Sequence, residues 1–452
     1  MGPPALTAGE IINREPLSRY QVTTIVLCGF VLVLDGYGSL SMGYVTTPVA
    51  ESTHIPVHSF GLILSASLIG LMVAAMGTGP IADRWGRKWP VILSALTFAL
   101  FSILNGRATT YDEFFVFRFL TGLGLGGAMP NAVALASEYA PKRLLAIIVV
   151  LLFIGMPLGG LICGLVSSAV ITGPGWPWVF YVGGIVPMVL AVVLIWALPE
   201  SAQFLVERAG DRKRAEKILA KISPAFAAGQ IALAEGGSAP RGAGAPVKHL
   251  FTEGRAWGTI LLWIPNFMNL LLLYFINSWL PSLLKVSGMS VSDGVLATAF
   301  VSFGGMVACV VEGSLINALG AYFVLLADFL LSAVFVVAVA LFTHPFGLAL
   351  TVTFFLGFLV IGGQAALNAM SANFYPTAIR STGVGWALGV GRLGSIVGPL
   401  LGGKLLAHGW APRQIIISGS VCGIFGWLAI RMSKLVQRNA TAYSREAGAG
   451  HP

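Results

Sequence analysis

The chain has little charge. Only 10% of its 452 residues are Asp, Glu, Lys or Arg, whereas a soluble globular protein carries about 25%. It also has only four cysteines. Each of them lies within an apolar run, and none is paired with another in a loop between such runs. We read these cysteines as small buried hydrophobic residues, which excludes a disulfide or zinc framework.

The histidines offer no catalytic pattern either. His54, His58 and His344 lie between apolar runs and lack the spacing of a metal site or a catalytic triad. We therefore expect neither a metal, nor another cofactor, nor an enzymatic activity. The first 20 residues are polar and the apolar run after them is too long for a signal peptide, so we expect no cleaved leader.

Long apolar runs dominate what is present, since 56% of the residues are hydrophobic. A membrane-spanning helix needs about 20 mainly apolar residues. The sequence predicts an all-α membrane protein with twelve such helices, in two bundles of six. The predicted spans are residues 21–47, 59–80, 89–107, 112–136, 144–170, 177–198, 256–284, 292–317, 322–343, 346–371, 383–407 and 411–433.

The distribution of Lys and Arg predicts the orientation. With the N-terminus in the cytoplasm, most of these residues fall on the cytoplasmic side, and the external side has only Arg107, Lys285 and Arg413. Positive charge marks cytoplasmic loops, so both termini are predicted to be cytoplasmic. The net charge of +9 is explained by this topology, and no nucleic-acid partner is expected.

Residues 199–255 divide the spans into two sets of six. Residues 202–222 are rich in Glu, Lys and Arg and predict short amphipathic helices on the membrane face, whereas residues 223–247 resemble a flexible linker. The predicted organisation is a cytoplasmic tail, a six-helix bundle, a cytoplasmic linker, a second six-helix bundle and a cytoplasmic tail, at residues 1–20, 21–198, 199–255, 256–433 and 434–452.

A charged turn follows the second span, where residues 79–88 read GPIADRWGRK. A weaker copy of this motif recurs at residues 313–320, and residues 138–141 likewise align with residues 373–376, which indicates an internal duplication. The motif resembles the loop between helices 2 and 3 of the major facilitator superfamily of transporters. Members of that superfamily bind substrate near the membrane midplane, between two six-helix repeats.

Charges inside predicted spans are the first functional candidates, because a charge in the bilayer core costs at least about 2.5–3.5 kcal/mol. Asp35 lies within the first span and is predicted to carry a proton or contact substrate, with a structural ion pair as the alternative. Arg118 and Arg392 lie within the fourth and eleventh spans, and a planar guanidinium suits a carboxylate. Packing through a charge pair is an equal alternative for Arg118. Glu312 and Asp328 are read as structural.

Neutral polar and aromatic residues add a predicted cavity lining. Gln364 and Asn368 are four residues apart and share one helix face. Together with Arg392, the lining would suit an aromatic anion; its other members are Tyr37, Asn266, Asn269, Tyr274 and Trp386. Near the cytoplasmic helix ends, Glu138 is expected to pair with Arg84 or Arg87 and latch one access state.

A closer resemblance rests on residues 118–131, RFLTGLGLGGAMPN, and on residues 375–392, YPTAIRSTGVGWALGVGR. Both segments resemble the aromatic acid:proton symporter family, as does Pro199-Glu200-Ser201 after the sixth span. The resemblance implies proton-coupled import of benzoate-like acids into bacteria. It matches the family's membrane charges to Asp35, Arg118 and Arg392, and its loop charges to Asp83, Glu138 and Arg380.

One departure concerns the first span. The family carries two carboxylates three residues apart there, and Gly38 replaces the second. We expect this loss to alter proton coupling and to make room for a larger or more negatively charged substrate.

The sequence thus predicts a monomeric transporter of the bacterial inner membrane that takes up an aromatic carboxylic acid together with protons. A uniporter or symporter of another organic anion or of a sugar is the alternative. A drug exporter would place acidic residues and not Arg392 in its cavity, and a membrane sensor would carry a larger soluble domain.

Overall fold

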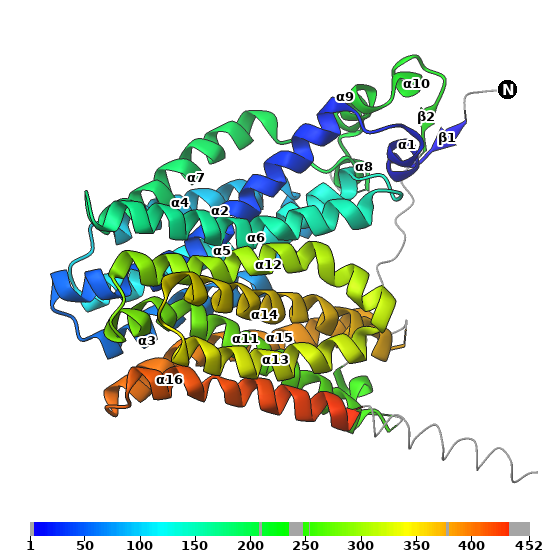
Figure 1. Cartoon of the computed structure of the whole chain (residues 1–452). Helices are drawn as coiled ribbons and strands as arrows, with labels where there is room; N and C mark the ends of the chain where they lie inside the picture. Colours follow the sequence, from blue (N-terminus) through cyan, green and yellow to red (C-terminus); the bar gives the residue numbers. More distant parts are fainter. Residues whose placement is uncertain (1–3, 208–209, 235–246, 253, 377–378, 434–452) are drawn as a thin grey trace, which may run out of the picture. The chain divides into compact units, whose positions relative to one another are not determined.

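The computed structural model describes residues 4–207, 210–234, 247–252, 254–376 and 379–433 (Figure 1). Within this part of the chain, twelve helices are long and apolar enough to cross a membrane, which confirms the predicted number of spans. They are α2 (Arg19–Thr53), α3 (Phe60–Trp85), α4 (Lys88–Asn105), α5 (Tyr111–Tyr139), α6 (Leu145–Ile171), α7 (Pro177–Ala197), α11 (Ala256–Val286), α12 (Val291–Leu319), α13 (Ala321–Leu341), α14 (Phe346–Phe374), α15 (Arg380–Ala407) and the segment Pro412–Ser433, which begins with α16 (Pro412–Ser418). The chain is a multi-pass membrane protein.

The turn between α3 and α4 is shorter than the motif at residues 79–88 suggests. Helix α3 continues through Pro80 and ends at Trp85, so Gly79 is helical. The chain reverses at Gly86, whose φ of +91° lies in the region that favours glycine. A Cβ atom there would also lie 2.3 Å from Oε2 of Glu200.

The chain divides into two compact units. The N-terminal unit comprises Met1–Ser41, Ala66–Val166 and Gly173–Arg241, and the C-terminal unit comprises Met42–Ser65, Ser167–Thr172 and Gly242–Pro452. The end of α2 from Met42, the last residues of α6 from Ser167 and the start of α3 up to Ser65 thus group with the C-terminal helices. Hydrogen bonds account for this grouping: Ser65 Oγ donates to the Ile396 carbonyl at 2.8 Å, and Thr47 Oγ1 donates to Ser282 Oγ at 2.8 Å.

A small cap joins the N-terminus to the segment after α7. It consists of β1 (Ala5–Leu6), α1 (Ala8–Arg14), α8 (Ala202–Glu207), α9 (Arg212–Ile222), α10 (Pro224–Ala227) and β2 (Ala232–Leu233), which lie together in Figure 1. Strands β1 and β2 pair in parallel. Thr7 and Glu10 form a capping box that starts α1.

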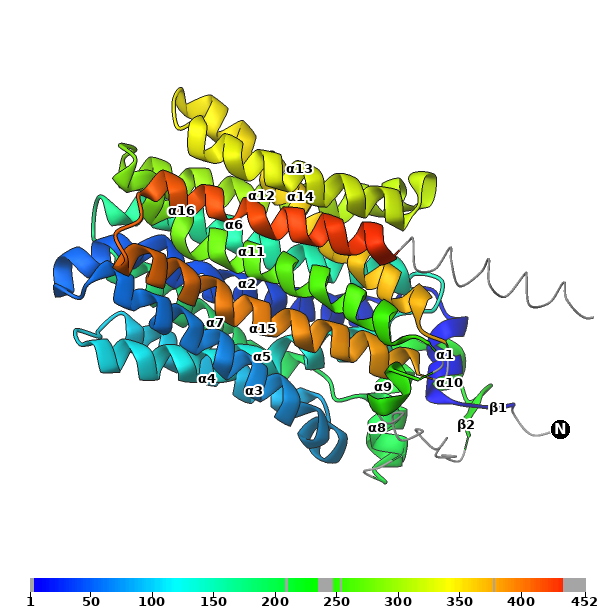
Figure 2. The ribbon, with the colours of Figure 1, turned by 90° about the horizontal axis from the view of Figure 1, so that it is seen from below.

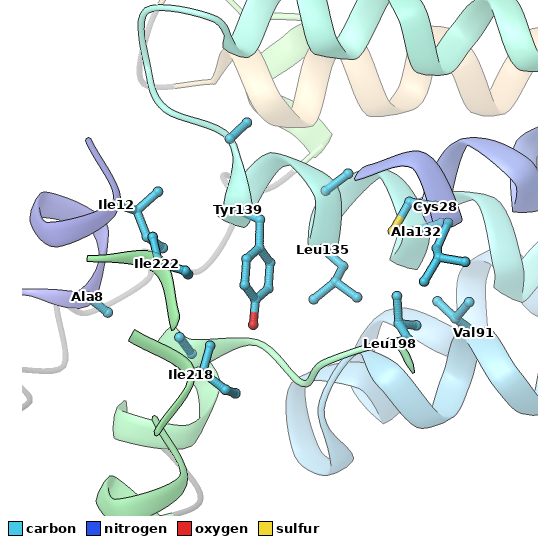
Figure 3. Close-up of a cluster of buried hydrophobic side chains, with 14 of the residues drawn as sticks. Ala8, Ile12, Cys28, Val91, Ala132, Leu135, Tyr139, Leu198, Ile218 and Ile222 are labelled. Atoms are coloured by element: carbon cyan, nitrogen blue, oxygen red, sulfur yellow. The ribbon is translucent and has the colours of Figure 1, made fainter. Parts of the chain in front are cut away.

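The apolar face of α9 packs on protein. Ala215, Ile218, Leu219 and Ile222 follow the i, i+3, i+4, i+7 spacing of an amphipathic helix and are buried. They belong to one hydrophobic cluster with Ile12 of α1 and residues of the long helices, including Leu135 and Tyr139 (Figure 3). The predicted contact of this helix with the membrane face is therefore replaced by burial against α1. Residues 235–246 of the predicted linker and the tail at 434–452 lie outside the described residues.

In the C-terminal unit, glycines allow pairs of helices to approach closely. Helices α11 and α15 lie side by side (Figure 2), and a Cβ atom at Gly394 of α15 would lie 2.2 Å from the Phe267 carbonyl oxygen. Helices α12 and α14 meet in the same way at Gly304 and Gly357. Small residues at such crossings let helix backbones pack directly in a membrane.

Candidate functional site

Four amide side chains form a connected network in the C-terminal unit. Asn269 Nδ2 of α11 donates to Gln364 Oε1 of α14 at 3.1 Å. Gln364 Nε2 donates in turn to Asn266 Oδ1 and to Asn368 Oδ1, both at 3.3 Å. The sequence assigned these residues to two separate helices, and the structure brings all four together.

The network joins α11 to α14 through the backbone as well. Asn269 Nδ2 also donates to the Val360 carbonyl at 3.0 Å, and Asn266 Nδ2 donates to the Leu262 carbonyl of its own helix. Asn266 and Asn269 are buried, whereas Gln364 is half-buried and Asn368 is exposed. Amides supply both donors and acceptors, so such a network suits a ligand with hydroxyl and carboxylate groups.

Arg392 of α15 lies beside the same stretch of α11. A Cβ atom at Gly391 would be 3.2 Å from the Asn266 carbonyl oxygen, so the two helices nearly touch next to Arg392. The guanidinium is half-buried, and it makes no hydrogen bond or ion pair with any residue that the structure describes. A guanidinium presents donors in a planar fork that matches a carboxylate.

An aromatic pair adjoins this region. Trp386 of α15 stacks on Trp263 of α11, with ring centroids 6.0 Å apart and planes at 18°. Trp263 precedes Asn266 by three residues on α11, and Trp386 precedes Arg392 by six residues on α15. The sequence prediction included Trp386 and missed Trp263, whose only signal was its position one turn before Asn266.

In the N-terminal unit, Asp35 lies in a closed and mainly apolar environment. Its side chain is buried, and it lines a small pocket together with Ser94 and with apolar residues of α2, α4, α5 and α7, namely Val31, Leu34, Ala95, Phe98, Leu125, Ala128, Pro187 and Leu190. A charged carboxylate is costly in such surroundings. The position is therefore compatible with a group that binds a proton.

Arg118 is enclosed among helices of the same unit. It is only 1% exposed, and its guanidinium donates to Ser41 Oγ and Ser67 Oγ, both at 3.3 Å, and to the Gly38 carbonyl at 3.4 Å. These groups are neutral oxygens of α2 and α3. Arg118 thus ties α5 to its neighbours through neutral oxygens, and among the described residues the structure does not show the charge pair that the packing alternative expected.

Two predicted lining tyrosines are also buried in helix contacts. Tyr37 Oη donates to the Val179 carbonyl of α7 at 2.9 Å, and a Cβ atom at Gly183 would be 2.7 Å from the Tyr37 ring. Tyr37 therefore holds α2 against α7. Tyr274 is 7% exposed on α11, two turns beyond Asn266.

The side chain that the family carries at position 38 has no space here. A Cβ atom at Gly38 would lie 2.4 Å from Cε2 of the buried Phe98. The expectation that Gly38 makes room for a larger substrate was therefore wrong, because Phe98 of α4 fills that space.

The expected latch is partly assembled. Arg87 Nε lies 3.5 Å from Glu138 Oε1, and Arg87 Nη2 lies 3.8 Å from Asp83 Oδ1. Arg84 is exposed. Arg380 belongs to the C-terminal unit, where its Nε donates to the Tyr375 carbonyl at 3.4 Å. Of the two arginines expected to pair with Glu138, the structure shows the pair for Arg87.

Glu200 organises the same loop, and the sequence reasoning assigned it no role. Its Oε1 accepts the backbone N–H groups of Arg87 at 2.7 Å, Lys88 at 3.2 Å and Ser201 at 2.9 Å. Arg87 provides no side-chain cap for α4, so the buried Glu200 carboxylate takes that place at the helix N-terminus. An anion is stabilised there by the unpaired N–H groups and the helix dipole.

We expect Glu200→Gln to lower the stability of the N-terminal unit. Glutamine keeps one acceptor but loses the negative charge, which is worth about 1–2 kcal/mol at a partly buried helix N-terminus. Thermal unfolding of the purified protein in detergent measures this loss as a lower melting temperature. The control is Glu207→Gln at the exposed end of α8, and an equal melting temperature for both variants would contradict the capping role.

Among the described residues, no group of three or more His, Cys, Asp or Glu side chains is placed to hold a metal ion.

Comparison with known proteins gives consistent matches over nearly the whole length. A sequence model described as "Major Facilitator Superfamily" matches residues 25–399. The chain is 37% identical to the 4-hydroxybenzoate transporter PcaK of Pseudomonas aeruginosa, over 96% of this chain and 99% of that protein. It is 34% identical to a gallate transporter of Pseudomonas putida, over 88% of each chain. Among solved structures, the partially occluded, inward-open xylose transporter XylE of Escherichia coli is similar in fold, with a TM-score of 0.69 at 18% identity over 91% of this chain and 97% of that one.

Proposed function

The chain belongs to the major facilitator superfamily, and we propose that it takes up an aromatic carboxylic acid together with protons. The observation that carries this proposal is Arg392, a guanidinium without an acidic partner among the described residues. Its helix packs, at Gly391, against the stretch of α11 that carries Asn266 of the amide network and Trp263 of the tryptophan pair. Two of the curated relatives are named for 4-hydroxybenzoate and gallate, which are both aromatic carboxylates.

In the proposed cycle, the substrate carboxylate binds the Arg392 fork, and its ring packs near Trp263 and Trp386. Asn266, Asn269, Gln364 and Asn368 bind hydroxyl groups on the ring. An aromatic ring brings apolar area and a carboxylate brings charge, which is the combination that this mixed apolar and polar lining suits.

Asp35 is the proposed proton carrier. Binding a proton removes its charge and so lowers the cost of enclosing the carboxylate among apolar side chains. The two halves would then alternate access to the site, as in other transporters built from repeats. Arg87, Glu138, Asp83 and Glu200, together with Arg84 at the end of α3, would hold the turn between α3 and α4 in one of the access states. Arg380 would act in the loop between α14 and α15.

We further propose that the protein is a monomer of the bacterial inner membrane with both termini in the cytoplasm. The excess of Lys and Arg in the loops assigned to the cytoplasm supports this orientation.

The test is uptake by proteoliposomes with and without an inward proton gradient. The labelled panel contains benzoate, hydroxybenzoates, protocatechuate, gallate, phthalates, muconate and a hexose. We expect the gradient to stimulate uptake of an aromatic acid, and we expect Asp35→Asn to reduce this stimulation by about tenfold or more.

Asp112→Asn is the matched control, because it makes the same change at an exposed position in the first turn of α5. If the gradient stimulates uptake of the hexose alone, the substrate is a sugar and the aromatic acid proposal is wrong. Uptake of an aromatic acid that ignores the gradient would instead favour a uniporter.

A further inference from the structure

Two buried carboxyl groups of the C-terminal unit face the same stretch of α14, at Gly362 and Gly363. They come from two helices that the proposed cycle does not use. Glu312 of α12 is 1% exposed, and Asp328 of α13 is 7% exposed. Both residues lie seven positions from the loop between their helices, about 10 Å along the helix axis.

Within the part of the chain that the structure describes, these two carboxyl groups have few hydrogen-bond donors. If both groups were ionised, neither carboxylate oxygen of Glu312 would have a hydrogen-bond partner among the described residues, and Oδ2 of Asp328 would also lack one. Two ionised carboxylates only accept hydrogen bonds. Buried carboxyl groups without a hydrogen-bond donor are expected to bind a proton, because burial disfavours the charged form.

No cation among the described residues of the surrounding helices neutralises the pair. Helix α14 has no titratable residue along Phe346–Phe374, and on α12 the Cys309 thiol lies three residues before Glu312. The other titratable or charged side chains of α11, α12, α13 and the segment from α16 have other contacts or lie elsewhere: Asp293 with Ser290, Tyr322 with Ser433, Arg413 with the Ala340 carbonyl, Arg431 over Trp427, Lys285 with Glu51, together with Tyr274 and the buried thiol Cys422. On α15, which packs on α14, Arg380 donates to the Tyr375 carbonyl, and Arg392 and Lys404 form no ion pair with a described residue.

Two glycines of α14, Gly362 and Gly363, leave a notch in the surface of this helix beside the two carboxyl groups. A Cβ atom at Gly362 would lie 1.6 Å from Oε2 of Glu312, and one at Gly363 would lie 3.6 Å from Oδ2 of Asp328. The Glu312 carboxyl thus occupies the space that a side chain at position 362 of α14 would need. The next residue along this helix is Gln364, the centre of the amide network.

We propose that Glu312 and Asp328 form a proton-binding site that is coupled to the amide network through α14. With one proton shared, the pair is compact and fits the notch at Gly362. Loss of that proton leaves two adjacent negative charges whose repulsion separates the carboxyl groups and displaces α14. Because Gln364 moves with α14, the protonation of the pair changes the substrate site.

The role in transport rests on the proposed function, but proton binding by the pair does not. Infrared difference spectra of the purified protein, recorded across a pH titration, test proton binding without any substrate. The spectra are recorded in an Asp35→Asn background, so that the proposed proton carrier adds no signal. We expect a protonated-carboxyl band there that Glu312→Gln and Asp328→Asn each remove. Asp293→Asn, the same kind of change at the start of α12, should leave the band in place.

The second measurement compares gradient-driven uptake with counterflow exchange in proteoliposomes. We expect both variants to keep counterflow and to lose gradient stimulation by about tenfold. If either single variant fails to fold, the double variant Glu312→Gln/Asp328→Asn serves, since two amides can form a hydrogen bond. A band that persists in both variants, wild-type gradient stimulation in both, or equal loss of counterflow and uptake would overturn the proposal. If the wild type transports no aromatic acid, the proposed function fails and the infrared result alone decides whether the pair binds a proton.

Discussion

Replacing Arg392 with glutamine is expected to weaken binding of the aromatic acid by at least roughly 30-fold, or about 2–5 kcal/mol. Among the described residues, the guanidinium has no acidic partner. The substitution therefore does not leave an acidic side chain of the protein unpaired. The loss would therefore fall on the substrate carboxylate, which keeps its charge but loses both donors of the fork.

The lysine variant separates charge from geometry. Arg392→Lys keeps the positive charge but cannot donate two parallel hydrogen bonds to one carboxylate, so we expect it to recover only part of the affinity. The measurement is the concentration dependence of uptake, together with direct binding of the labelled acid to purified protein.

Lys404→Gln provides a matched control at the far end of the same helix, where the side chain is exposed. It removes one positive charge from α15 without touching the proposed site. Wild-type binding by Arg392→Gln, or equal weakening by Lys404→Gln, would remove Arg392 from the site.

Placing a side chain at Gly38 is expected to destabilise the N-terminal unit by about 1–3 kcal/mol. The cause is the contact with Phe98, since a Cβ atom would lie 2.4 Å from its ring and the Phe98 side chain is buried. Gly38→Ala tests this steric effect alone, and Gly38→Asp adds the second carboxylate that the related symporters carry.

A smaller residue at position 98 should reverse the effect. We expect Phe98→Leu to cost little in the Gly38→Asp background and to restore much of its melting temperature, because contacting residues couple by about 0.5–3 kcal/mol. The double variant then reports how a second carboxylate changes proton coupling.

The control for Gly38 is Gly77→Ala in α3, where a Cβ atom would meet no atom within 4 Å. This change should be neutral or slightly stabilising, because alanine favours helices over glycine by about 0.5–1 kcal/mol. Equal melting temperatures for Gly38→Ala and Gly77→Ala would show that Phe98 adapts freely.

Several features of the site followed from spacing along single helices. Gln364 and Asn368 are four residues apart, and their hydrogen bond confirms that they share a face. The pairing of Glu138 with an arginine of the neighbouring loop was likewise predicted, and Arg87 is the partner. These predictions depend on helical periodicity and on the short turn at Gly86, both of which are local properties.

Contacts between helices were not predictable in this way. Nothing in the spacing of Arg118 shows that hydroxyl and carbonyl oxygens of α2 and α3 enclose it, or that Phe98 occupies the space beside Gly38. The amphipathic pattern of α9 indicated an apolar partner, but a membrane surface and helix α1 satisfy that pattern equally well.

The sequence by itself determined the membrane class, the number of spans and the positions of the intramembrane charges, because the cost of placing polar groups in lipid acts on each segment separately. Only the tertiary structure decided which charges are enclosed, which meet each other and which stay available. Asp35, Arg118, Arg392, Glu312 and Asp328 all look alike as charges within apolar runs. Their differences arise from the neighbouring helices, which supply Arg118 with neutral oxygens, place Glu312 and Asp328 against the same stretch of α14 and leave Arg392 without an acidic partner among the described residues.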